Sequence, residues 1–310
     1  QNSEGAGIGI GPLPNRRPCL PFDYPSTRRL MTTRFAPSPT GLLHKGHAFS
    51  ALTAYSLARR QGGHFLLRIE DIDSTRCTRE NALGIFEDLA WLGIEWERPV
   101  RFQSEHGEDY CAAARRLAER GLLYPCFCTR ADIRREIERA GQAPHGSEDL
   151  PYPGTCRRLS EDERAARLAA GIPCALRLDQ EKARSLAGDS LLWTDTRLGT
   201  QEARPERLGD VVLVRKDIGT SYHLSVVVDD GLQGVTDIVR GVDLFEATHL
   251  HRLLQSLLGL PVPTYHHHPL LTDASGRRLA KRDFAITLKS LRDSGMSSTS
   301  LREELGFPPA

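Results

Sequence analysis

The stretch Arg34-Phe35-Ala36-Pro37-Ser38-Pro39-Thr40-Gly41-Leu42-Leu43-His44-Lys45-Gly46-His47 decides the fold of this chain. It begins as the end of an apolar strand, and its two prolines and first glycine exclude both a longer strand and an early helix. Helical periodicity starts directly afterwards, with Phe49, Leu52 and Tyr55 on one face. The pattern predicts a strand, a turn and a helix whose first turn carries two histidines.

These histidines, His44 and His47, stand where a helix exposes its first N–H groups and the positive end of its dipole. Such a helix N-terminus binds phosphate well, so the residues favour a phosphate site. The alternative is an ordinary strand–turn–helix with histidines on its surface.

The segment resembles the signature of class I aminoacyl-tRNA synthetases of the glutamyl type, whose His-x-Gly-His sequence binds ATP. Nucleotidyltransferases share that short sequence, but the preceding run from Arg34 to Gly41 makes the resemblance specific. The resemblance implies an α/β fold: a Rossmann-type doubly wound parallel sheet with an inserted, smaller, zinc-bearing α+β subdomain. It implies that His44 and His47 act in catalysis. The implied ATP-binding residues of this stretch are Pro37, Thr40, Gly41, His44, Gly46 and His47.

Composition sets the broad class of protein. The 310 residues suggest one large or two modest domains, and the apolar and charged fractions are those of a soluble globular protein. No apolar run approaches the roughly 20 residues of a membrane helix. The net charge of +1 means that any nucleic-acid surface is a local patch. Seven cysteines without a secretory segment favour a reducing, cytoplasmic location.

An amino-acid pocket is expected beside the phosphate site. The run from Phe65 to Ile69 predicts a buried strand that ends at Glu70, and acids at the carboxyl end of a parallel strand lie where such sheets bind ligands. An arginine fork such as that of Arg34 holds a carboxylate, whereas Glu70 can hold an ammonium. The alternative for Glu70 is a solvated strand end.

The segments 222–230 and 234–241 also resemble the glutamyl type, in which the positions of Tyr222 and Arg240 contact substrate glutamate. An arginine suits the side-chain carboxylate, although Arg240 could instead form a surface salt bridge. By resemblance, the residues that bind L-glutamate are Arg34, Ala36, Ser38, Glu70, Tyr222 and Arg240.

Three cysteines, Cys126, Cys128 and Cys156, have the character of a zinc site that needs a fourth ligand. The spacing resembles that of glutamyl-queuosine tRNA(Asp) synthetases, and by that match Tyr152 is the fourth ligand of a structural Zn2+. Chemistry alone also allows His145. The alternative is three reduced cysteines without metal.

The run His266-His267-His268 looks like a metal site. Successive side chains of an extended strand alternate between its two faces, however, so we expect no metal there.

A second ATP motif is expected near the C-terminal end. A turn at 273–276 precedes Arg278-Leu279-Ala280-Lys281-Arg282, in the place of the family's Lys-Met-Ser-Lys-Ser. The sequence departs from that motif with arginine at its first and last positions and alanine for the small hydroxyl residue. It keeps Lys281, which is the implied catalytic and ATP-binding lysine. The alternative is a solvated basic face.

Together the motifs imply an enzyme that activates L-glutamate with ATP and Mg2+ and transfers it to queuosine in tRNA(Asp), as a monomer. One rival is a truncated or compact glutamyl-tRNA synthetase that charges the tRNA 3′ end. Others are a non-catalytic RNA-binding paralogue and a small-molecule nucleotidyltransferase.

The expected organisation begins with a disordered extension at 1–30 and has no anticodon-binding domain. The Rossmann halves are expected at 31–125 and 208–272, the zinc-containing insert at 126–207, and the second ATP loop with a helical tail at 273–310.

Overall fold

The computed structural model describes residues 30–129, 131–132, 152–188, 190–271 and 286–309. The predicted disordered extension therefore falls, apart from its last residue, outside the described part of the chain.

Three N-terminal strands form one half of a parallel sheet. β1 (Thr32–Phe35), β2 (His64–Ile69) and β3 (Glu97–Phe102) pair in parallel in that order. Parallel pairing needs crossover connections, which α1 (Lys45–Arg60) and α2 (Arg79–Trp91) supply. Their apolar residues share one core with the C-terminal helices α9 (Leu288–Asp293) and α10 (Ser298–Glu304).

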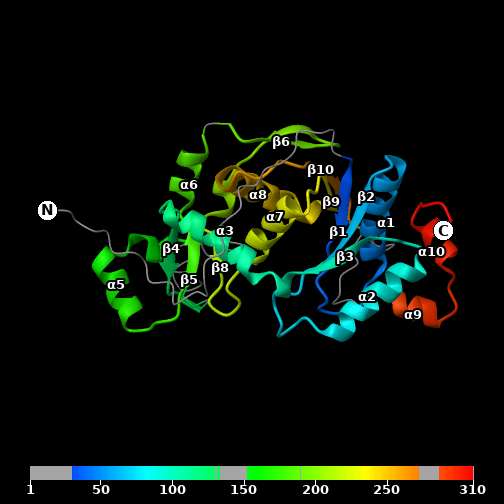
Figure 1. Cartoon of the computed structure of the whole chain (residues 1–310), viewed down its shortest axis with the longest axis horizontal. Coiled ribbons are helices and arrows are strands. Elements are labelled where there is room, and N and C mark those ends of the chain that lie inside the picture. Colours follow the sequence, from blue (N-terminus) through cyan, green and yellow to red (C-terminus); the bar gives the residue numbers. More distant parts are fainter. Residues whose placement is uncertain (1–29, 130, 133–151, 189, 272–285, 310) are drawn as a thin grey trace.

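The second half has the strand order β7-β6-β10-β9. β9 (Asp237–Gly241), β10 (Thr264–His268) and β6 (Leu192–Asp195) are parallel, and β7 (Gly199–Glu202) is antiparallel at the edge. Helices α7 (Tyr222–Leu232) and α8 (Phe245–Leu258) pack against it. The halves meet where Thr236 N donates to Thr32 O, which places β1 beside β9 (Figure 1). This is the predicted Rossmann-like α/β arrangement.

A separate antiparallel sheet joins β4 (Leu123–Cys126), β5 (Ala175–Leu178) and β8 (Val212–Val214). It lies with α5 (Glu161–Ala169) toward the end of the molecule opposite α9 and α10 (Figure 1). Helices α3 (Gly107–Glu119) and α6 (Gln180–Ala187) contribute to the same apolar core as α7 and α8. Single 3-10 turns complete the chain: η1 (Gln103–Glu105), η2 (Thr155–Arg158), η3 (Pro205–Leu208) and η4 (Val242–Leu244).

The expected boundary at residues 207 and 208 does not separate the sheets. β8 follows it but pairs with β5 in the antiparallel sheet, whereas β6 precedes it but pairs with β10 in parallel. A short β-branched run fits either kind of sheet, so its partners rather than its composition decide where it lies. The division into domains stays a prediction.

Local signals explain the helix ends. Thr78 accepts a hydrogen bond from Asn81 N at the start of α2. The sequence Ser160-x-x-Glu163 predicts a capping box, and these two residues form it at the start of α5. The spacing of Leu83, Phe86 and Leu89 predicts that all three face inward from α2, but this is wrong for Leu83, which is 52% exposed.

Candidate active site

The His-x-Gly-His turn is built as a helix cap. His44 is the N-cap of α1; its Nδ1 accepts from Gly46 N at 3.1 Å, and its own N–H donates to Nδ1 of His47 at 3.2 Å. Because each Nδ1 accepts a backbone proton, the proton of each neutral ring lies on Nε2, where it can be donated to a phosphate oxygen. A Cβ on Gly46 would lie 2.9 Å from Cε1 of His44, so the absence of a side chain at residue 46 allows the His44 ring to lie against the start of the helix.

A pocket of about 660 Å3 opens beside this turn, a size typical of small-molecule sites. Within the described part of the chain it gathers every predicted ATP and amino-acid residue except Gly41, which is not in its lining. Its predicted members are Arg34, Ala36, Pro37, Ser38, Thr40, His44, Gly46, His47, Glu70, Tyr222 and Arg240.

Lys281 lies outside the described residues, but the chain on both sides of its segment reaches this region. Leu270 and Leu271 line the pocket. After the undescribed segment, Thr287 forms a bridge with His44, and Leu288 N donates to Leu43 O at 2.8 Å. Both flanks of the second predicted ATP motif are therefore fixed near the first.

The guanidinium fork of Arg34 is engaged within the protein. Its Nε and Nη2 atoms contact the two oxygens of Asp230 at 3.0 and 3.4 Å, and Nη1 donates to Val239 O at 3.3 Å. The carboxylate that this fork grips is thus Asp230, which sequence analysis did not identify as its partner. A direct role for Arg34 in amino-acid binding stays a prediction.

Glu70 lies at the end of β2 and pairs with Arg68 at 3.2 Å. Burial raises the pKa of Glu70, although the charges of Arg68 and Arg34 oppose that rise. Burial also disfavours the ionised form of Asp230, but Arg34 and Arg68 together hold its pKa below the usual range. The interpretation of Glu70 as a solvated strand end is wrong, because the residue is only 8% exposed.

Arg240, on β9, is buried and has a different environment. Its Nε donates to His267 Nε2 at 3.2 Å, its Nη2 to Thr248 Oγ1 at 2.6 Å, and its Nη1 lies 3.3 Å from His251 Nδ1. Among the described residues no carboxylate forms an ion pair with it. The alternative of a surface salt bridge is therefore wrong for the described part of the chain.

The other pocket residue from the second half, Tyr222, is the first residue of α7 and lines the cavity beside Arg240. Burial raises the pKa of its hydroxyl, which keeps it a neutral hydrogen-bonding group.

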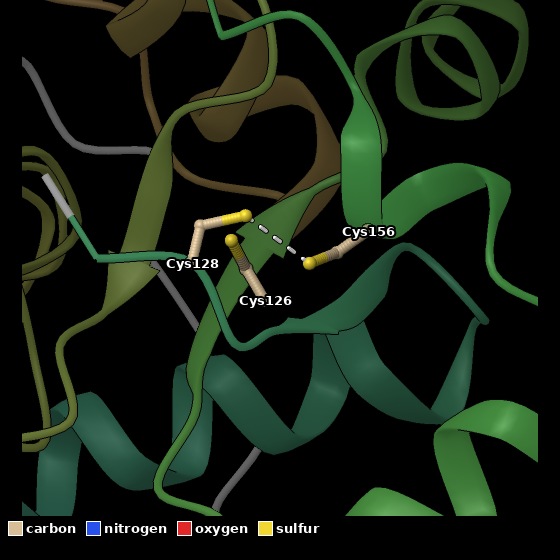
Figure 2. A group of neighbouring side chains, drawn as sticks. All are labelled: Cys126, Cys128 and Cys156. Carbon is tan, nitrogen blue, oxygen red and sulfur yellow. Dashed lines mark hydrogen bonds between the residues drawn. The ribbon is translucent and has the colours of Figure 1, made fainter. Parts of the chain in front are cut away.

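The cysteines form a second cluster at the end of β4 (Figure 2). The sulfur atoms of Cys126, Cys128 and Cys156 lie within 4.8 Å of one another, and η2 carries Cys156 back to the other two. The Tyr152 Oη atom lies 3.5 Å from the sulfur of Cys126 and 3.4 Å from that of Cys128. Three soft sulfurs and a phenolic oxygen around one point fit a tetrahedral metal site. His145 lies outside the described residues.

The sequence does not by itself identify Arg68 or the acceptors around Arg240 as parts of the site. The signal for Arg68 was a single charge inside the otherwise apolar run from Phe65 to Ile69, because a buried charge requires partners. No comparable local signal pointed to Thr248 or His251, because they lie on α8, whose leucine spacing indicates only a helix packed against the core.

No described helix combines the length and the apolar character needed to cross a bilayer.

Comparison with known proteins identifies the family to which this chain belongs. The family model of the class I tRNA synthetases (E and Q), catalytic domain, matches residues 30–307. The Glutamyl-Q tRNA(Asp) synthetase of Rhodobacter capsulatus is 49% identical over 89% of this chain and all of its own length. The protein of the same name from Symbiobacterium thermophilum is 42% identical over 90% of this chain and 86% of its own.

A solved glutamate tRNA ligase from Elizabethkingia meningosepticum, in complex with its amino acid, is similar in fold. It is 29% identical with a TM-score of 0.69, over 82% of this chain. The chain spans about half (52%) of that ligase. The chain belongs to the class I tRNA synthetases of the E and Q type and, within them, to the glutamyl-Q tRNA(Asp) synthetase family.

Proposed function

We propose that this chain activates L-glutamate with ATP and transfers the glutamyl group to queuosine in tRNA(Asp). The observation that carries the proposal is the shared pocket: the histidine turn at the start of α1 and Arg240 on β9 line the same cavity. The names of the similar full-length relatives support the same substrates. The chain is proposed to act as a monomer in the cytoplasm, where tRNA and ATP are available.

In the first step an oxygen of the glutamate α-carboxylate attacks the α-phosphorus of ATP. A new P–O bond forms, the bond to the β-phosphate oxygen breaks, and pyrophosphate leaves. Two anions must approach each other, so catalysis depends on positioning and on donors aimed at the phosphate oxygens. His44 and His47 supply such donors through Nε2, and Lys281 is proposed to add a cation. Mg2+ is the expected companion of ATP.

The amino acid is proposed to lie between the histidine turn and β9. Arg240 binds its side-chain carboxylate, and Glu70 is the proposed partner of its ammonium, since that carboxylate lines the pocket at the end of β2. Arg34 and Tyr222 complete the wall, with Ala36 and Ser38 supplied by the turn after β1.

In the second step a hydroxyl oxygen of the queuosine cyclopentenediol attacks the carbonyl carbon of glutamyl-adenylate. The ester bond forms, the bond to the phosphate oxygen breaks, and AMP leaves. The hydroxyl proton is released to solvent water, and no described residue is assigned as its acceptor.

Cys126, Cys128, Cys156 and Tyr152 are proposed to hold a structural Zn2+ that ties β4 to η2. The guanidinium carbon of Arg177 lies 3.8 Å from the ring centroid of Tyr152. Burial raises the pKa of the Tyr152 hydroxyl, so a phenolate ligand would depend on the charge of the metal ion itself. The cluster lies away from the pocket lining, so no catalytic step is assigned to the metal.

The alternative function is charging of the tRNA 3′ end, and the structural similarity to a glutamate tRNA ligase supports testing it. Labelled glutamate, ATP and tRNA(Asp) with or without queuosine distinguish the two. The product is cut between the anticodon loop and the acceptor stem, and the label is measured in each fragment. Label in the anticodon fragment only when queuosine is present supports the proposal; label at the 3′ end of both tRNAs refutes it. A non-catalytic paralogue would give no ATP–pyrophosphate exchange at all.

A further inference from the structure

The histidine run at the end of β10 is divided between the two faces of its strand, as expected. His267 is 3% exposed, whereas His266 and His268 on the other face are partly exposed. His267 Nδ1 lies 2.7 Å from Oδ2 of Asp195, whose Oδ1 also accepts two backbone N–H groups at 2.9 Å. A carboxylate against Nδ1 fixes the proton on that nitrogen, which leaves the lone pair of Nε2 pointing elsewhere.

That lone pair faces Arg240. Of the five N–H groups of the guanidinium, one on each nitrogen meets a neutral acceptor: His267 at Nε, Thr248 at Nη2 and His251 at Nη1. One N–H on each terminal nitrogen remains, which is the number that a bidentate carboxylate takes.

Neutral acceptors make Arg240 different from the other pocket arginine. Arg34 is compensated by Asp230, whereas no described carboxylate compensates Arg240. Burial and the neighbouring Arg240 charge lower the pKa of His267 to about 4. His251 is lowered as well, chiefly by burial. Both rings are therefore neutral near pH 7, so they orient the guanidinium without cancelling or repelling its charge.

We infer that Thr248 and His267 are positioning residues, which aim Arg240 as an uncompensated cation at the side-chain carboxylate of the substrate. Asp195 acts one step further back by fixing the tautomer of His267. The inference rests on the proposed function, because it assumes that the pocket receives a dicarboxylic amino acid.

Two matched pairs of variants test it by ATP–pyrophosphate exchange. Thr248→Val removes the hydroxyl acceptor and Thr248→Ser keeps it. His267→Asn keeps a donor for Asp195 but no acceptor for Arg240, whereas the amide oxygen of His267→Gln reaches the place of Nε2. A hydrogen bond to a charged group is worth about a tenfold change in affinity or more. We expect the KM for glutamate to rise about tenfold in Thr248→Val and His267→Asn, to return toward wild type in the paired variants, and the KM for ATP to change less than about twofold.

Thr248 Oγ1 also lies 3.3 Å from His267 Nε2, so both pairs probe one hydrogen-bond network, and a variant that fails to fold leaves the other pair to test it. An unchanged KM for glutamate in Thr248→Val or in His267→Asn overturns the inference. So does an equal rise of both KM values, which a merely structural role would produce. If no amino acid supports pyrophosphate exchange by the wild-type protein, the proposed function itself is wrong. If glutamate supports exchange and the variants have the same KM for glutamate as the wild type, only the inference is wrong.

Discussion

Arg68 Nη1 lies 2.8 Å from Oδ1 of Asp230, and the side chains of the two residues are 0% and 7% exposed. The same carboxylate also pairs with Arg34, and Arg68 reaches Glu70 on its other side. A buried cluster with two guanidinium groups on one aspartate ties β1 and β2 to α7. Two members of this cluster, Arg34 and Glu70, line the proposed amino-acid pocket.

Asp230→Asn should therefore destabilise the protein strongly. Removing one partner of a buried ion pair costs about 3–5 kcal/mol, because the remaining charges stay buried without compensation. Urea denaturation measures the change. The control is Glu95→Gln, which removes the exposed partner of Arg59 at 3.0 Å and should cost less than about 1 kcal/mol. Equal effects of the two substitutions would contradict the structural role given to the cluster.

The local parts of this architecture could be predicted from sequence, and the distant pairings could not. The strand from Phe65 to Ile69, the turn after Arg34 and the capping box at Ser160 depend on neighbouring residues. Asp230 lies 162 residues from Arg68, and the two meet only because β9 takes its place beside β1. The carboxylate partner of Arg34 was missed for the same reason.

Gly46→Ala should weaken the use of ATP. The added Cβ would lie 2.9 Å from Cε1 of His44, so the ring must move away from its place over the helix start. Displacements of this size cost about tenfold or more in catalytic rate. The measurement is kcat/KM for ATP in pyrophosphate exchange. Gly84→Ala is the control, since its Cβ would make only an ordinary contact of 3.7 Å with Leu42. Wild-type kinetics in Gly46→Ala would show that ATP use does not depend on the close contact between Gly46 and the His44 ring.

Cys128→Ser should abolish tight metal binding. Wild-type protein purified without chelator is expected to carry about one zinc ion per chain. The variant should carry much less, because a tetrahedral structural site loses most of its affinity when one thiolate is removed. Elemental analysis measures the metal, with Cys111→Ser on α3, away from the cluster, as the control. Tyr152→Phe and His145→Ala then identify the fourth ligand. Loss of zinc only in His145→Ala would rule out Tyr152.

Lys281→Ala tests the second predicted ATP motif. Loss of a cation aimed at the transferring phosphate should lower kcat by about 10²–10³-fold, as for other donors to a developing oxyanion. Lys289→Ala is the matched control, since that ammonium contacts Asp293 at 2.6 Å on the surface of α9. Near wild-type exchange in Lys281→Ala would remove the assignment and favour a solvated basic face.

Stability should fall as the pH is lowered from 7.5 to 5. Burial, with the charge of Arg240 second, lowers the pKa of His223 and of His267 to about 4. The unfolded chain, with a pKa near 6.5, therefore binds protons in this range that the folded protein does not. Stability consequently rises with pH between about 4 and 6.5, by on the order of 2 kcal/mol for each histidine between pH 5 and 7.5.

Glu70 and Asp88 oppose this trend, because burial raises the pKa of both carboxyl groups, that of Asp88 to about 6, so the folded protein binds protons there that the unfolded chain does not. Burial also lowers the pKa of His251, so three buried histidines outweigh two carboxyl groups and the net slope keeps its sign. Urea denaturation at pH 7.5 and 5 measures it. His223→Gln should flatten the slope relative to wild type, since it removes one of the titrating rings. A slope that is unchanged in His223→Gln would mean that the buried histidine is not the group that titrates.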